Sequence, residues 1–263
     1  MERAKEAKEK RLMATILEIS GLGKRFGGIQ AVDDFSLDIK EGEIMGLIGP
    51  NGAGKTTLFN LITGFIKPDS GTVKFKENNI TKLKPSKIAN LGVARTFQQT
   101  KPFKRMLAVE NVALALLSER AKKSKNGDDV LGKALEALRR VEVIPPKENL
   151  FKLGSQLSHG YTKRLDIARA LALEPEVLLL DEPFGGLGFK EMSIMNKVIQ
   201  KLHDDGITIV IIEHKIRELM KLVERLAVMH FGAKIAEGTP REIAMNEKVC
   251  EAYLGKEGGS LFA

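Results

Sequence analysis

The sequence predicts an α/β fold in which a mostly parallel, helix-covered sheet is interrupted by a helical insertion. Strand-like and helical segments alternate after residue 177, and a glycine-rich turn near residue 50 separates a buried strand-like segment from an amphipathic helix. Residues from about 99 to 173 show helical patterns and polar loops without a convincing strand. Strands that alternate with helices are typical of parallel sheets with helices on both faces.

Length and composition set the first limits. With 263 residues, of which 43% are apolar, the chain can bury a core as one large domain or two lobes. A charged fraction of 29% is usual for a globular protein and excludes disorder of the whole chain. The excess of 42 Lys and Arg over 34 Asp and Glu gives a net charge of +8. This charge suits a nucleotide, a nucleic acid or an acidic lipid surface without choosing among them.

Signals for export or membrane insertion are lacking in the sequence. The single cysteine, Cys250, cannot form an internal disulfide, so nothing indicates an oxidising compartment. The longest apolar runs, such as Val112–Leu117, fall far short of the ~20 residues of a membrane-spanning helix. No apolar signal core follows the charged N-terminus. We therefore expect a cytoplasmic chain that reaches a membrane only as a docked subunit.

The expected elements follow from the spacing of apolar residues. Strands are predicted at Ile16–Ile19, Phe35–Ile39, Ile44–Ile48, Thr72–Phe75, Val93–Phe97, Val177–Leu180, Thr208–Ile212 and Leu226–His230. After the glycine-rich turn, Leu58, Leu61, Ile62 and Phe65 share one face of a helix that ends near Gly64. Further helices are predicted at Lys190–Leu202 and Ile216–Val223. The domains expected are a charged extension 1–13, a nucleotide-binding core 14–98 and 173–240, a helical subdomain 99–172 and a tail 241–263.

Residues Gly49–Thr56, GPNGAGKT, match the phosphate-loop pattern G-x-x-x-x-G-K-[ST]. The glycines let successive backbone N–H groups point inward, and the following helix adds the positive end of its dipole. Lys55 reaches the β- and γ-phosphates, and the Thr56 hydroxyl is placed for Mg²⁺. A chance glycine-rich turn of this kind arises in roughly one chain of this length in a hundred. A chance match that also lies between a strand and a helix is rarer still. The motif therefore predicts binding of a nucleoside triphosphate.

The apolar strand Val177–Leu180 ends in two carboxylates, Asp181 and Glu182. In a parallel sheet, ligands lie beyond the carboxyl ends of the strands, which places Asp181 to hold Mg²⁺. Glu182 would face the γ-phosphate and orient or deprotonate the attacking water. The alternative is that the two acids cap the next element; beside a phosphate loop, that is the minor reading.

The motifs that follow resemble those of one family, the ATPases of ABC transporters. Leu157–Tyr161, LSHGY, resembles the family's signature motif, and Leu180–Pro183, LDEP, its second carboxylate motif. Gln98 resembles its glutamine-loop residue, His214 its switch histidine and Phe26 the aromatic that stacks on adenine. These motifs occur in the family's order over about residues 16–240. The resemblance implies a RecA-like P-loop NTPase core with an antiparallel β subdomain and a helical subdomain.

At three of these positions, the residue and its surroundings also suggest a functional role, and each role has a competing explanation. An exposed Phe26 ring ahead of two glycines can stack on a base, whereas the rival is an ordinary core phenylalanine. Gln98 follows a strand at the edge of the helical insertion and can touch Mg²⁺ or the lytic water, whereas the rival is a polar loop end. His214 ends a buried strand, so a satisfied structural histidine competes with a hydrogen bond to the γ-phosphate.

Ser158 and Gly160 precede a helix expected from about Lys163, so a hydroxyl, free N–H groups and a helix dipole converge on an anion. The resemblance implies that this anion is the γ-phosphate held by the other subunit of a head-to-tail dimer. The sequence departs from the family pattern at His159 and Tyr161 in the signature and at Gly188 in the next motif. These departures bear on the geometry of the partner site and on turnover.

Within the family, Arg95–Gln98, the Glu213–His214 pair, the long insertion and Tyr253–Gly255 look most like the ATPase subunits of branched-chain amino acid importers and their urea or amide relatives. The LSHG variant at Leu157–Gly160 leans toward the urea branch. The resemblance implies hydrolysis of ATP with Mg²⁺, a like or sister cassette as partner, and separate transmembrane permease subunits. It also implies an indirect link to a substrate-binding protein and a peripheral position on the inner face of the cell membrane.

The basic side chains allow a second reading, an ABC ATPase that acts on nucleic acid. The N-terminal lysines together with the lysines and arginines at 122, 123, 125, 152, 163 and 164 could form a nucleic-acid footprint, but no interleaved aromatic residues or reading motif accompany them. We interpret them as solvated faces or as attraction to an anionic leaflet, and expect no nucleic-acid partner. A third reading, a small-molecule P-loop kinase, explains Gly49–Thr56 but neither the signature nor His214.

The predicted site residues fall into three groups. Those expected in catalysis are Glu182, His214, Gln98 and Lys55. Those expected to bind the nucleotide are Phe26, Gly49, Pro50, Asn51, Gly52, Ala53, Gly54, Lys55, Thr56, Thr57, Ser158 and Gly160. Those expected to hold the metal are Thr56, Gln98 and Asp181.

Overall fold

The computed structural model describes residues 14–99, 101–123, 129–142 and 152–254. The described residues form two compact units, one within Met1–Pro85 and Thr208–Ala263, the other within Ser86–Ile207. The predicted extension 1–13, Lys125, Gly255 and the rest of the predicted tail to residue 263 lie outside the described residues, as do the side chains of Lys122 and Lys123.

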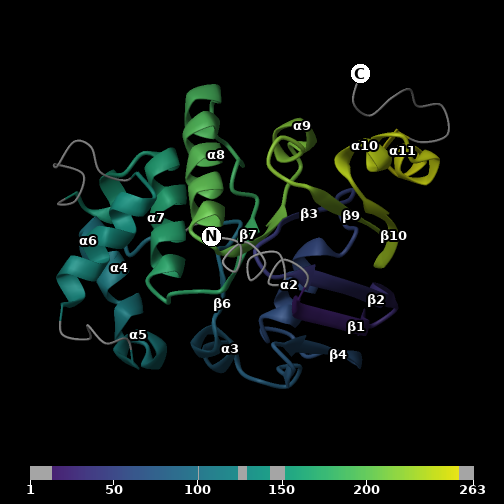
Figure 1. The fold of residues 1–263 in the computed structure, drawn as a ribbon, viewed down its shortest axis with the longest axis horizontal. Coiled ribbons are helices and arrows are strands. Elements are labelled where there is room, and N and C mark those ends of the chain that lie inside the picture. Colours follow the sequence, from purple (N-terminus) through teal and green to yellow (C-terminus); the bar gives the residue numbers. More distant parts are fainter. Residues whose placement is uncertain (1–13, 100, 124–128, 143–151, 255–263) are drawn as a thin grey trace, which may run out of the picture. The chain divides into compact units, whose positions relative to one another are not determined.

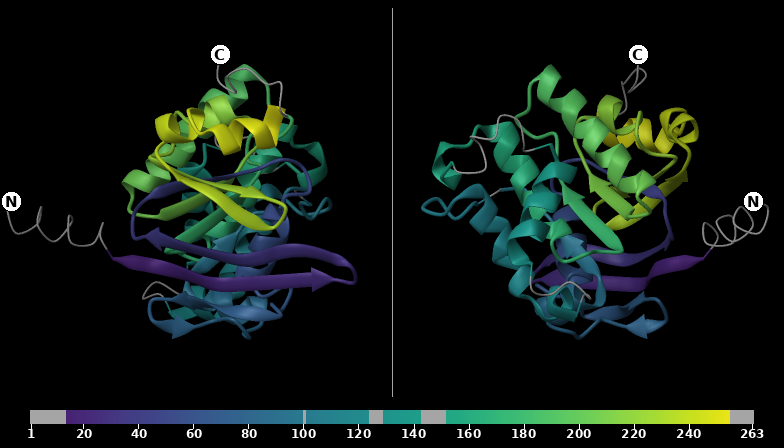
Figure 2. Two further views of the ribbon diagram at one scale, coloured as in Figure 1. Left: turned by 90° about the vertical axis from the view of Figure 1, so that its right-hand side faces the viewer. Right: turned by 60° about the vertical axis from the view of Figure 1, so that its left-hand side comes forward.

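The first unit contains an antiparallel sheet in the order β2-β1-β4-β5. Its strands are β1 (Thr15–Phe26), β2 (Ile29–Lys40), β4 (Ser70–Phe75) and β5 (Asn78–Asn79). Figure 2 shows β1 and β2 as a long hairpin, which turns through Gly27 at a φ of 55°. The three strands predicted here are confirmed but are longer than predicted, because polar residues at their ends continue the pairing beyond the apolar segments.

The first unit also contains a parallel set of strands, with β3 (Ile44–Ile48) between β8 (Thr208–Ile212) and β9 (Arg225–His230). All residues of β3 and β8 are buried, which explains their uninterrupted apolar sequences. A strand that the sequence did not predict, β10 (Ala233–Gly238), pairs antiparallel with β9 after a turn at Phe231 and Gly232.

Among its described residues, the first unit holds four helices: α2 (Lys55–Ile62), α9 (Ile216–Leu219), α10 (Pro240–Ala244) and α11 (Glu247–Leu254). The predicted apolar face of α2 is wrong at Phe65, which is 54% exposed beyond the helix end. Gly64 stops the helix by adopting a φ of 74°. The prediction of a helix to Val223 is also wrong, because α9 is a single turn. The two C-terminal helices occupy what was predicted as a tail, and Thr239 caps α10 by accepting from Glu242 N.

The second unit pairs β6 (Val93–Arg95) in parallel with β7 (Val177–Asp181). Its helices are α3 (Pro85–Leu91), α4 (Ala108–Ala113), α5 (Glu119–Lys123), α6 (Val130–Arg140), α7 (His159–Leu171) and α8 (Phe189–Asp204), with 3-10 turns η1 (Ala115–Leu117) and η3 (Gly154–Gln156). Figure 1 shows α4, α6 and α7 packed side by side, and Val112, Leu138 and Leu165 are buried among the described residues. The predicted helical insertion is thereby confirmed.

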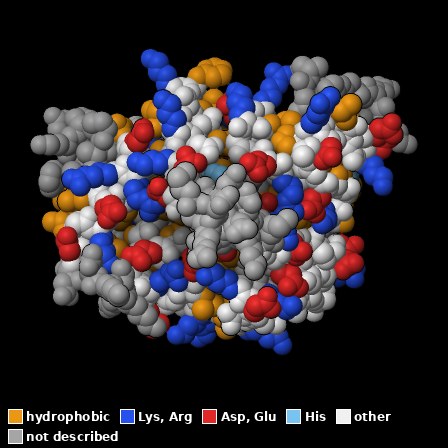
Figure 3. Space-filling model, viewed as in Figure 1, with side chains coloured by type: hydrophobic (Ala, Val, Ile, Leu, Met, Phe, Trp, Pro, Cys, Tyr) orange, Lys and Arg blue, Asp and Glu red, His pale blue; other side chains and the backbone are white. Residues whose placement is uncertain are grey.

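No helix among the described residues is both long enough and apolar enough to cross a bilayer. On the face drawn in Figure 3, lysine and arginine side chains are interspersed with aspartate and glutamate side chains.

Candidate nucleotide site

The phosphate loop lies in the first unit, between β3 and α2. Gly54 begins α2 with a φ of 104°, and Gly52 has a φ of 80°, conformations that favour glycine. Gly49 is required by space, because a Cβ there would lie 2.1 Å from the Met229 carbonyl oxygen. The predicted glycine pattern therefore follows from backbone conformation and from close packing.

Lys55 is folded into its own loop. Its side chain is 5% exposed, and its Nζ donates to the carbonyl oxygens of Gly49, at 2.6 Å, and Pro50, at 2.9 Å. Asn51, Gly52 and Thr56 are exposed, and Thr57 is half-buried. The Lys55 amine thus lies inside the loop, while Asn51, Gly52 and Thr56 are exposed at its outer edge.

Two C-terminal segments brace the phosphate loop. The Gly232 N–H donates to the Ala53 carbonyl at 3.0 Å, and the Gly232 carbonyl accepts from Asp33 N at 2.9 Å. Tyr253 of α11 reaches Gly49: burial raises the pKa of the Tyr253 hydroxyl, and a hydrogen bond with the Gly49 backbone acts in the opposite direction. Apart from Tyr253 as a family marker, these contacts could not be predicted, because they join chain segments that are far apart in the sequence.

Phe26 ends β1, and its side chain is 45% exposed. The Nζ of Lys24 lies 5.5 Å from the centre of the Phe26 ring and also forms an ion pair with Asp69 at 2.8 Å. The alternative of a core phenylalanine is therefore wrong, and stacking on adenine stays a prediction.

His214 follows β8 and is exposed. Its backbone N–H and that of Lys215 donate to Glu213 Oε2, at 2.9 Å and 3.1 Å, and Glu213 itself is 2% exposed. The buried polar residue at this strand end is therefore Glu213, and the role of His214 at the γ-phosphate stays a prediction.

Asp181 lies in the second unit at the end of β7, with 1% of its side chain exposed. Its Oδ2 accepts from Arg95 Nη2 at 2.7 Å in a buried ion pair. Its Oδ1 is buried and has no hydrogen-bond partner among the described residues. A carboxylate oxygen left open in this way fits a ligand of Mg²⁺, which prefers one or two carboxylates together with phosphates and water. Among the described residues, no group of three or more acidic, His or Cys side chains could hold a metal ion.

Glu182 directly follows Asp181. The backbone of Glu182 adopts the strained left-handed conformation, with a φ of 50°. Its carbonyl oxygen accepts from Lys163 Nζ at 2.9 Å and from Gly185 N at 3.1 Å. The same Lys163 amine donates to the carbonyl oxygen of Gln98, whose side chain is exposed, at 3.2 Å. One lysine therefore joins the backbones of two predicted site residues.

The predicted start of the signature helix is wrong. Helix α7 begins at His159, with Ser158 as its N-cap, so Gly160 lies within the first turn. A Cβ on Gly160 would lie 2.3 Å from Glu191 Oε1, so a larger residue there would require the Glu191 side chain to shift. Ser158 is exposed and its hydroxyl makes no cap hydrogen bond within the described part of the chain. This arrangement leaves the hydroxyl available to an anion.

The assignment of the basic residues at 163 and 164 to solvated faces is also wrong. Lys163 and Arg164 are each only 7% exposed. Arg164 Nη1 donates to the Glu142 carbonyl at 2.9 Å, and its guanidinium stacks over the Tyr161 ring at 4.5 Å. Both side chains pack inside the second unit, so neither contributes to a basic surface.

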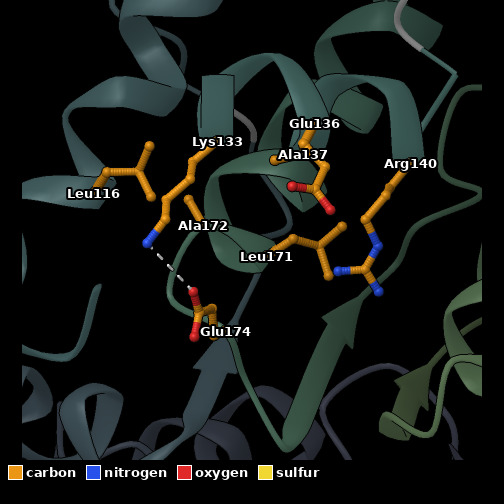
Figure 4. A pocket seen from close by; sticks show the side chains of 8 residues that line it. All are labelled: Leu116, Lys133, Glu136, Ala137, Arg140, Leu171, Ala172 and Glu174. Atoms are coloured by element: carbon orange, nitrogen blue, oxygen red, sulfur yellow. Dashed lines mark ion pairs between the residues drawn. The ribbon is translucent and has the colours of Figure 1, made fainter. Parts of the chain in front are cut away.

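A separate hollow of about 90 Å³ lies in the second unit against α6 and the end of α7 (Figure 4). Lys133 and Arg140 line it together with Glu136 and Glu174, and Lys133 Nζ lies 3.8 Å from Glu174 Oε1. The mixed charges balance one another, and none of the predicted site residues lines this hollow.

A phosphate loop between a buried strand and a helix, together with a second strand that ends in paired carboxylates, defines a P-loop ATPase. Residues 32–185 match the family described as ABC transporter, and residues 233–259 match the one described as branched-chain amino acid ATP-binding cassette transporter. The chain belongs to the ABC transporter family of ATPases.

Similar proteins of known sequence match along almost their whole length. The high-affinity branched-chain amino acid transport ATP-binding protein LivG of Salmonella typhimurium is 39% identical over 254 residues, 92% of this chain and 98% of that protein. The corresponding protein BraF of Pseudomonas aeruginosa is 38% identical with the same coverage. The lipopolysaccharide export system ATP-binding protein LptB of Escherichia coli is 34% identical over 245 residues, 93% of this chain and 99% of LptB.

Solved structures give the same fold. A nucleotide-free ATP-binding cassette from an ABC transporter has a TM-score of 0.83 and 30% identity, covering 92% of this chain and all of that one. A dimeric bacterial ABC transporter cassette has a TM-score of 0.76 and 29% identity, covering 86% of this chain and 99% of that one. The predicted fold class, an α/β P-loop NTPase, is confirmed.

Proposed function

We propose that this chain is the ATP-hydrolysing subunit of an importer for branched-chain amino acids. The observation that carries the proposal is the match of residues 233–259 to the branched-chain amino acid cassette family, because this segment lies outside the ATPase motifs shared by all cassettes. LivG and BraF support it by matching over nearly the full length of both chains. The urea and amide importers remain the alternative cargo class, which uptake of labelled urea represents in the experiment.

In the proposed reaction, the loop Gly49–Thr57, through its free backbone N–H groups, and the Lys55 amine bind the phosphates, which requires Lys55 to exchange its loop carbonyls for phosphate oxygens. Phe26 stacks on adenine. Glu182 orients the attacking water and accepts its proton while the new bond to the γ-phosphorus forms and the bond to ADP breaks. His214 hydrogen-bonds the γ-phosphate.

The metal ligands we propose are Thr56, Gln98 and Asp181. A magnesium ion bound with ATP supplies neutralisation of the charge on the β- and γ-phosphates. The open Oδ1 of Asp181 supports this assignment, since it is a buried carboxylate oxygen without a described partner.

We further propose that the chain pairs head-to-tail with a like or sister cassette, so that Ser158 and Gly160 meet the γ-phosphate held by the partner. The dimeric form of a related cassette supports such pairing. In this assembly, the helical subdomain 99–172 docks on separate permease subunits at the inner face of the membrane, and a substrate-binding protein acts indirectly through them.

Uptake in cells that lack this chain tests the proposal. Cells are supplied with the parent chain or with Glu182→Gln, and uptake of labelled leucine, isoleucine and valine is measured beside uptake of labelled urea. We expect the parent to restore uptake of the three amino acids and Glu182→Gln to leave it absent. Restoration of urea uptake alone would move the cargo to the alternative class, and uptake unaffected by loss of the chain would overturn the proposal.

A further inference from the structure

Helix α7 carries three polar side chains at i, i+4 and i+7: His159, Lys163 and Asp166. Residues at this spacing lie along one face of a helix. His159 bonds to the backbone of the loop that follows Asp181, Asp166 to the loop that contains Gln98, and Lys163 to both loops. We name these three residues the α7 seam.

Lys163 forms the centre of the seam. Its side chain is nearly buried, and its Nζ bridges the carbonyl oxygens of Glu182, at 2.9 Å, and Gln98, at 3.2 Å. Burying an ammonium group is costly unless hydrogen bonds compensate it, so a buried lysine with two carbonyl acceptors is held in one geometry. The amine therefore fixes the distance between the two loops.

Asp166, one turn further on, holds the residue before Gln98. Its Oδ2 accepts from the Phe97 N–H at 3.2 Å, and its Oδ1 accepts from Arg169 Nη1 at 3.2 Å. The Gln98 segment is thus held on both sides, at the Phe97 amide by Asp166 and at its own carbonyl by Lys163.

His159 forms the end of the seam nearest the signature. Its Nε2 lies 2.9 Å from the Gly185 carbonyl oxygen. A Cβ on Gly186, which has a φ of 73°, would lie 2.8 Å from the same nitrogen, so the glycine leaves the space that the imidazole occupies. His159 and the glycines of the following loop therefore fit one another in this chain.

We propose that His159, Lys163 and Asp166 are positioning residues that tie the backbones of Gln98 and Glu182 to the first turn of the signature helix. The inference rests on the proposed roles of Gln98, Glu182 and Ser158. Because α7 is a continuous helix of 13 residues, an anion bound at Ser158 and the two hydrolytic residues would be held by one rigid element. Displacing reacting groups by about 1 Å can cost a factor of about 100 in rate, which makes such a tie kinetically important.

Lys163→Met tests the central contact, because it keeps the length of the side chain and removes the donor. Steady-state hydrolysis of Mg-ATP gives kcat and KM, and titration with a fluorescent ATP analogue gives the Kd. We expect kcat to fall about 10- to 100-fold while the Kd changes less than about 3-fold. Lys163→Arg, which retains a charged donor, should recover part of the loss. Lys201→Met, the same change at an exposed position of α8, should match the parent.

A double variant separates positioning from general damage to the fold. If Lys163 acts through Gln98, adding Lys163→Met to Gln98→Ala should lower kcat by much less than it does in the parent. Equal losses in both backgrounds, or an unchanged kcat in Lys163→Met, would overturn the inference. Should Lys163→Met fail to fold by circular dichroism, the exposed His159→Ala decides: we expect a several-fold lower kcat at unchanged Kd, and parent-like kinetics would refute the seam. A parent chain without ATPase activity would instead refute the proposed function.

Discussion

The buried ion pair between Arg95 and Asp181 allows a prediction whose size can be worked out from the structure. Only 4% of the Arg95 side chain and 1% of the Asp181 side chain are exposed, and the two charged groups lie 2.7 Å apart. Arg95→Met removes the cation and leaves a buried carboxylate. Breaking a buried pair from one side costs about 3–5 kcal/mol. At about 2–4 °C per kcal/mol for a chain of this size, Tm should fall by about 6–20 °C.

Thermal unfolding followed by circular dichroism at neutral pH measures this change. Arg95→Met combined with Asp181→Asn should recover at least half of the lost stability, because the uncompensated charge is gone. Lys24→Met is the control: it breaks the pair with Asp69, which is 52% exposed, and should cost no more than about 1 kcal/mol. A Tm for Arg95→Met within about 3 °C of the parent would refute the reasoning, as would a double variant no more stable than the single one.

Three further predictions concern other parts of the chain. Phe26→Ala should weaken ATP binding about 5- to 150-fold by nucleotide titration while Phe26→Tyr retains it, since stacking on a base contributes about 1–3 kcal/mol; equal affinity of the alanine variant would remove the adenine role. Gly49→Ala should abolish ATP binding and lower Tm, because the added Cβ meets the Met229 carbonyl at 2.1 Å; a variant that binds ATP normally would contradict the packing described. Burial raises the pKa of Asp166 in the folded chain, so its ionised form costs stability above that pKa. The parent should therefore gain stability relative to Asp166→Asn as the pH falls through the folded pKa towards the ordinary value, and urea unfolding between pH 7 and 4 should show this sign and not the reverse.

Local signals predicted the elements that lie inside the sheets. Ile44–Ile48 and Thr208–Ile212 match the observed strands residue for residue, because a strand buried on both faces must be apolar throughout. The phosphate loop was predictable because glycine conformation, lysine and hydroxyl all lie within one short segment. By contrast, β10 has mostly half-buried residues and thus no clear alternation, so its pairing with β9 had no sequence signal.

The contacts around the predicted site residues could not be predicted, because they join distant parts of the chain. A lysine is usually exposed to solvent, but Lys163 is buried. Its amine donates to the carbonyl oxygens of Glu182 and Gln98, which lie 19 and 65 positions away in the sequence. The partner of Asp181 is 86 positions away. The start of α7 at His159, four residues before the predicted start near Lys163, also differs from the sequence prediction.

The most direct test of ATP-dependent pairing is the mass of the Glu182→Gln variant by light scattering during size-exclusion chromatography. With Mg-ATP the variant should elute at twice the mass of one chain, and with Mg-ADP it should return to the single-chain mass. Single chains that are saturated with Mg-ATP, as shown by bound nucleotide in the same peak, would contradict the proposal that Ser158 of one chain meets the γ-phosphate held by another.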